Sequence, residues 1–217
     1  MALTGFNPEV VNTSISAVKS AYSELMNSLY NGVQKTFIGG MSDKWACNQA
    51  QTFFAGVVEG MNGLCYSGTG SINTVFESVV ASMNSAAQAW AQETESSYTP
   101  QSFDAFTQNY DSSAIVENIA GVRGIDLEQA SPVAATLTTT AESATAALSS
   151  AQSAVQNSGF IGGNMQESLI SSLERIKGNI SNAFNGFTDN AKRAIDETVA
   201  SYGDTEGKVS QAFTGNN

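Results

Sequence analysis

The chain has no histidine, and only 13% of its residues are charged. The lack of histidine excludes the Ser-His and Cys-His pairs of nucleophilic enzymes and most transition-metal sites. No carboxylate pair is suited to acid–base chemistry, because Asp196-Glu197 and Glu93/Glu95 have the pattern of solvated helix surfaces. We therefore expect no enzymatic activity, with no catalytic residue, no metal and no cofactor.

Basic residues are also scarce. Nine Lys and Arg face twenty Asp and Glu, and the formal net charge is -11. Nucleic acid binding needs clustered basic side chains, so we expect no nucleic acid partner. The same imbalance disfavours binding to anionic membrane surfaces.

Long apolar runs are missing as well. No stretch reaches the roughly 18 apolar residues that a transmembrane helix needs, so we expect no transmembrane segment. The N-terminal sequence MALTGFNP has neither a basic leader nor an apolar region of the signal-peptide type. If the protein is secreted, we expect a leaderless route to the exterior or the cell surface.

Only two cysteines are present, Cys47 and Cys65. On one continuous predicted helix they would lie about 27 Å apart, too far for a disulfide bond. We interpret both as buried, small apolar residues, with pairing between molecules as the alternative.

The sequence does contain an internal repeat. The tetrapeptide FIGG at residues 37–40 returns at residues 160–163, and the apolar positions that follow it correspond without gaps. We interpret the chain as two tandem copies of a unit of about a hundred residues. Glycine pairs end helices readily, so we expect the inter-helix turns at Gly39, Gly40, Gly162 and Gly163.

Apolar residues at three- and four-residue steps predict a helix from about Pro8 to Lys35 in the first copy. A second helix, capped by Ser42, follows to about Trp90, and the glycine-containing patch at 67–70 leaves its continuity open. The second copy repeats this plan. Its helices are expected at 133–155 and, along a seam that includes Val199, at 169–213.

A polar segment containing Pro100 separates the copies, and residues 114–130 have the spacing of a short helix despite Gly121 and Gly124. We predict a first hairpin at 1–97, a linker at 98–130 and a second hairpin with a C-terminal tail at 131–217. A lone hairpin exposes its apolar stripe. The expected fold is therefore all-α, with two tandem antiparallel hairpins packed as an elongated four-helix bundle.

Three residues stand out as candidate functional positions. Trp45 follows the first glycine turn, while Tyr202 and Glu206 lie four residues apart and share one helix face. The alternative interpretation is structural, with two core aromatic residues and one solvated glutamate near a frayed helix end.

These features resemble the WXG family of helical-hairpin proteins exported by type VII secretion systems. The resemblance rests on the hairpin of about a hundred residues, on Trp45 and on a Tyr-x-x-x-Glu motif at Tyr202 and Glu206. Residues 200–209 are similar to the second-helix end of the early secreted antigen branch. In that family a turn tryptophan of one hairpin lies near the Tyr-x-x-x-Asp/Glu of its partner, and the two form a composite export signal.

The chain departs from the family pattern in an ordered way. Cys47 stands where the family's Trp-x-Gly has glycine, and Ser168 occupies the corresponding turn of the second copy, which has no tryptophan. Val79 and Met83 occupy the places of Tyr202 and Glu206 in the first copy. Each copy therefore keeps half of the signal, as in a fused pseudo-heterodimer.

The resemblance implies a secreted, non-enzymatic type VII substrate or export partner, with the secretion ATPase as its first partner and a host protein or a second copy as others. Two alternatives stay open. The low charge and the Asn, Gln, Ser and Ala content suit a self-assembling filament, needle or flagellin-like subunit. A membrane-active secreted factor would instead open its hairpins to expose apolar residues such as Phe53 and Phe187.

Overall fold

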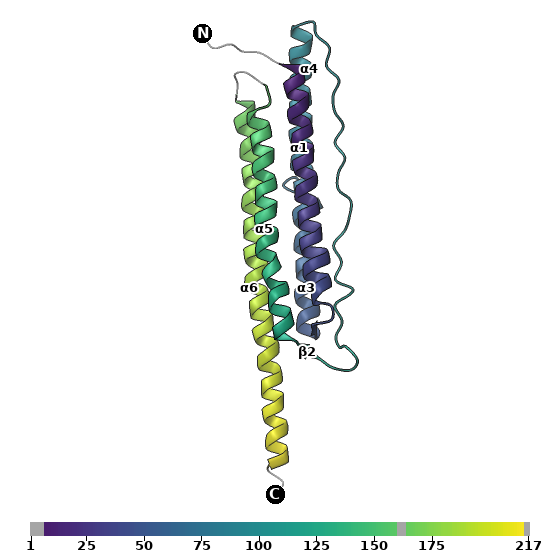
Figure 1. The fold of residues 1–217 in the computed structure, drawn as a ribbon, viewed down its shortest axis with the longest axis vertical. Helices are drawn as coiled ribbons and strands as arrows, with labels where there is room; N and C mark the ends of the chain where they lie inside the picture. Colours follow the sequence, from purple (N-terminus) through teal and green to yellow (C-terminus); the bar gives the residue numbers. More distant parts are fainter. Residues whose placement is uncertain (1–6, 160–163, 215–217) are drawn as a thin grey trace. The chain divides into compact units, whose positions relative to one another are not determined.

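The computed structural model describes residues 7–159 and 164–214, with the side chains of those up to residue 205. The fold is an all-α helical bundle, as predicted, with one two-stranded ladder. The elements are α1 (Pro8–Leu29), the π-helix η1 (Tyr30–Ile38), α2 (Gly39–Met41), β1 (Trp45–Ala46), α3 (Asn48–Tyr66), α4 (Ile72–Glu93), β2 (Gly124–Ile125), α5 (Leu127–Gln156) and α6 (Met165–Thr214) (Figure 1). None of the helices in the described part of the chain is apolar over a length that would cross a membrane.

The first helical run continues to Met41, so the turn expected at Gly39 and Gly40 is wrong. Both glycines keep helical backbone, and the chain leaves the helix only after Met41. A Cβ atom on Gly40 would lie 3.1 Å from a methyl group of Val133, so this glycine lets the helix approach α5 closely. The second predicted turn, Gly162 and Gly163, lies outside the described residues.

The helix predicted from Ser42 to Trp90 is divided into α3 and α4. Gly68 adopts a φ of +83°, a left-handed conformation that ends α3 after Tyr66. The Ser71 side chain then accepts a hydrogen bond from the Thr74 N–H at 3.3 Å and caps α4. Local turn and cap chemistry therefore overcomes the continuous apolar seam.

The short helix expected within 114–130 does not form before residue 127. Reciprocal backbone hydrogen bonds between Ile119 and Val122 close a tight turn, with Ala120 and Gly121 at positive φ. Such a turn is incompatible with a helix, although the apolar spacing suggested one. Helix α5 begins at Leu127, earlier than the predicted start at residue 133. The Asp126 side chain accepts a hydrogen bond from the Gln129 N–H at 3.1 Å and caps the helix.

The chain forms two compact units that both draw on several helices. The first comprises Met1–Leu29, Asn62–Asn109 and Ala141–Asn182, and the second comprises Tyr30–Met61, Tyr110–Thr140 and Ala183–Asn217. In the first unit α1 packs against α4, and the ring of Tyr22 lies 5.2 Å from that of Phe76. In the second unit an aromatic cluster of Phe37, Phe53 and Phe54 packs beside Trp45.

Candidate functional site: the contact of Trp45 with α6 and the adjoining groove

Trp45 lies in β1 rather than at the start of a helix. Its backbone pairs with Ile125 in the antiparallel ladder, and the preceding carbonyl of Lys44 accepts a hydrogen bond from the Asp126 N–H at 2.8 Å. The side chain has no exposed surface. Backbone pairing with the segment before α5 thus fixes the position from which the indole reaches across the second unit.

The indole of Trp45 contacts α6 through its polar edge. Its Nε1–H donates to the Oγ1 atom of Thr198 at 3.3 Å, and the Thr198 hydroxyl donates to the carbonyl of Ala194 at 2.7 Å. The ring stacks on Phe53 and meets Phe54 edge-on, with both centroids at 5.7 Å. A buried indole normally needs such an acceptor, because its N–H is costly to bury unpaired.

Cys47 occupies the junction between β1, α3 and α6. Its sulfur accepts a hydrogen bond from the Ala50 N–H at 3.4 Å and lies 3.7 Å from the Thr198 hydroxyl. The residue therefore caps α3 and touches α6, which glycine at this position could not do. Cys47 and Cys65 are both buried and are not joined by a disulfide bond, which confirms their interpretation as small interior residues.

Tyr202 lies one helical turn beyond Thr198 and is half-buried. Burial raises the pKa of its hydroxyl; the nearby Cys47 adds to this rise, while Arg123 opposes it. The structure therefore brings Trp45, Cys47 and the Tyr202 turn of α6 to one region of the second unit. Glu206 belongs to α6, but its side chain is outside the described residues, so its role stays a prediction.

The sequence seam missed Thr198, which is completely buried, and included Val199, which is 41% exposed. Steps of three and four residues join Ile195, Thr198 and Tyr202, which places them on one face of the helix. This spacing could have identified Thr198 as a buried residue. Thr198 was missed because it is polar, and the seam was traced through apolar residues.

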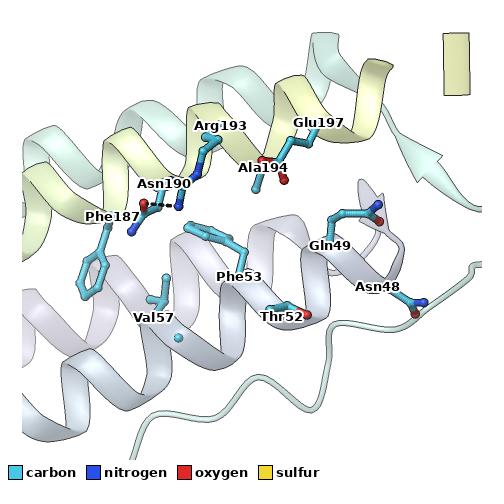
Figure 2. Close-up of a pocket in the computed structure, with 11 residues that line it drawn as sticks. Asn48, Gln49, Thr52, Phe53, Val57, Phe187, Asn190, Arg193, Ala194 and Glu197 are labelled. Carbon is cyan, nitrogen blue, oxygen red and sulfur yellow. Dashed lines mark hydrogen bonds between the residues drawn. The ribbon is translucent and has the colours of Figure 1, made fainter. Parts of the chain in front are cut away.

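A groove of about 520 Å³ lies beside this contact, between α3 and α6. Figure 2 shows Phe53, Val57 and Phe187 directed into it. Its polar rim on α6 comprises Asn190, Arg193, which donates to the Asn190 side chain at 3.0 Å, and Glu197.

Phe53 connects the groove to the buried contact, because it both lines the groove and stacks on Trp45. Within the described part of the chain, no three Cys, Asp or Glu side chains are grouped as a metal site would require. The groove combines an apolar floor with a polar rim, as ligand-binding sites commonly do. Comparisons of the chain with protein-family models, curated proteins and solved structures found no match.

Proposed function

We propose that the chain is a non-enzymatic substrate or export partner of a type VII-like secretion system. In this proposal the secretion machinery reads the α6 surface around Tyr202 and Glu206. The hydrogen bond between Trp45 and Thr198 carries the proposal, because it joins the turn of the first hairpin to α6 one helical turn before Tyr202. The family resemblance places a turn tryptophan near a Tyr-x-x-x-Glu motif across two chains, and here one chain supplies both.

The burial of Trp45 separates the roles of the three residues. A side chain with no exposed surface cannot be contacted by a partner while the bundle stays closed. Trp45 therefore acts as a positioning residue that holds α6 through Thr198. Tyr202 keeps part of its surface in solvent and is available for contact.

An export assay tests the proposal. The tagged chain is expressed in a host with a type VII-like system, and the secreted and intracellular fractions are quantified. Tyr202→Ala and Glu206→Ala should each abolish export while the folded protein accumulates inside the cell. Ser201→Ala is the matched control, since Ser201 is exposed beside Tyr202. Normal export of both α6 variants would refute the proposal.

Fusion of both halves in one chain replaces a bimolecular association with an intramolecular one of high effective concentration. The purified chain should therefore be a monomer whose mass does not change with dilution. Light scattering measures this directly. Growth of the mass with concentration would favour the self-assembling alternative instead.

A further inference from the structure

An extended segment, residues 98–108, lies along α1 and α4 in the first unit and has no helix or strand of its own (Figure 1). We call it the strap. The helices hold it mainly through side chains that bind its main chain, in the way that a neighbouring strand would. At two strap residues, Gln101 and Phe106, these side chains bind both the N–H and the carbonyl group, and we call these two sites the anchors. The Tyr66 hydroxyl also donates to the carbonyl of Gln108.

The first anchor is Asn84 on α4, which is 9% exposed. Its Nδ2 atom donates to the carbonyl of Gln101 at 2.8 Å, and its Oδ1 atom accepts from the Gln101 N–H at 3.1 Å. The hydroxyl of Tyr98 donates to the same Oδ1 at 2.7 Å. One amide group thus satisfies both main-chain groups of a single strap residue.

The second anchor uses Tyr22 on α1 and Asn73 on α4. The Phe106 N–H donates to the Tyr22 hydroxyl at 2.6 Å, and Asn73 donates to the Phe106 carbonyl at 3.1 Å. The Tyr22 hydroxyl in turn donates to Asn73 Oδ1 at 2.6 Å. These three hydrogen bonds again satisfy both the N–H and the carbonyl group of one strap residue. One of the two binding side chains comes from α1 and the other from α4.

Strap side chains add sequence preference between the anchors. The Gln101 amide donates to the carbonyl of Asn12 at 2.8 Å and accepts from the hydroxyl of Ser16 at 3.2 Å. The ring of Phe103 lies 4.7 Å from that of Tyr22. The face therefore favours a glutamine at the first anchor and an aromatic residue two positions later, before the Phe106 anchor.

We propose that this α1–α4 face is a binding site for an extended segment of a partner protein with the pattern Gln-x-Phe, whose main chain also reaches the second anchor three residues after the Phe, and that the strap occupies it in the resting chain. Any extended peptide can supply the main-chain groups that Asn84, Tyr22 and Asn73 bind. An unoccupied face would leave these groups without the partners that offset their burial. Residues 94–97 and 109–123, on the two sides of the strap, contain no helix, so the strap can leave without unwinding α4 or α5. The proposal is independent of the export function.

Competition with the strap sets the expected affinities. A tethered segment acts at an effective concentration on the order of millimolar, so a free peptide binds the wild-type chain weakly. Weakening the strap in cis should tighten binding of the free peptide, because a larger fraction of the molecules then presents an open face. We expect a gain of at least about tenfold in affinity.

The test uses the full chain carrying Phe103→Ala and Phe106→Ala in its strap, and a fluorescent synthetic peptide with the natural sequence of residues 97–110. Fluorescence polarisation should show binding at least tenfold tighter than to the wild-type chain, and a scrambled peptide should not bind. Adding Asn84→Ala should remove that binding, whereas Gln88→Ala, an exposed position one turn further along α4, should not.

A modified peptide tests the same hydrogen bond without any change to the protein, so the result does not depend on correct folding of the Asn84→Ala chain. N-methylation of the peptide at the position of Gln101 removes the N–H that donates to Asn84 Oδ1. This change should weaken binding to the strap variant at least tenfold. Absence of binding to the folded strap variant, or equal binding of the N-methylated peptide, would overturn the proposal. Light scattering identifies the occupant, because a strap-exchanged dimer of the wild-type chain would assign the face to a second copy instead of a partner protein.

Discussion

Removal of the Thr198 hydroxyl should destabilise the chain through Trp45, although the two residues lie 153 positions apart. Thr198→Val keeps the side-chain shape, but it leaves the buried indole N–H without its acceptor. An unpaired buried donor costs about 1–3 kcal/mol. The Ala194 carbonyl, which also loses a hydrogen bond from Thr198, still belongs to the helix ladder, so the indole dominates the cost.

A double-mutant cycle measures the coupling free energy between the Trp45 indole and the Thr198 hydroxyl. In the Trp45→Phe background no indole N–H exists, so Thr198→Val should cost less than about 0.5 kcal/mol, and the coupling energy should be about 1–3 kcal/mol. Thr198→Ser keeps the hydroxyl and serves as the control, with a loss of about 0.8 kcal/mol for the buried methyl group.

Urea unfolding followed by both circular dichroism and fluorescence measures these free energies, and coincident transitions justify a two-state treatment. If Thr198→Val costs the same with and without the indole, the hydrogen bond does not contribute as argued. The contact between Trp45 and α6 would then be a matter of packing alone.

Three further results follow from the close contacts and the buried phenol. Gly32→Ala would place a methyl group 2.1 Å from the Thr140 hydroxyl and should lower the free energy of unfolding by about 1–3 kcal/mol, as urea unfolding would show; no loss would mean that the helices separate easily. Gly56→Ala, in open space on α3, should instead raise it by about 0.5–1 kcal/mol in the same assay, and a loss would contradict its placement. Burial raises the pKa of Tyr22 above 10.0, so the folded state keeps a proton that the unfolded state releases. The stabilisation is therefore present below pH 10 and lost as the pH rises above it; Tyr22→Phe should flatten this fall in denaturation curves taken at increasing pH, and an unchanged slope would exclude Tyr22 as its source.

The helices were predictable because their apolar periodicity survives packing, as Val11, Ile15 and Val18 illustrate on α1. The predicted helix ends were wrong at glycines, because a glycine can either continue a helix or end one. Gly40 continues a helix because Val133 needs the room, whereas Gly68, at positive φ, ends one. The sequence around each glycine does not reveal the side chain from a distant helix that decides between these outcomes.

The candidate site was predictable in its residues more than in its contacts. Trp45 and Tyr202 stood out as aromatic residues at defined positions, and the structure places Trp45 against the stretch of α6 that carries Tyr202. Thr198 and Cys47 became informative only through long-range hydrogen bonds. The anchors of the strap could not be predicted from the sequence either. They join Gln101 and Phe106 to the side chains of distant residues, and no local sequence pattern indicates these contacts.

The composition of the two units has a consequence for synthesis of the protein on the ribosome. Each unit combines three separate stretches of chain, and the first needs residues up to Asn182 while the second needs the part of α6 that begins at Ala183. Neither unit can therefore be completed while most of the chain is still being translated. The apolar surfaces that pack against these last stretches stay uncovered until synthesis is nearly finished, and during that interval a chaperone or a transport receptor can engage the nascent polypeptide.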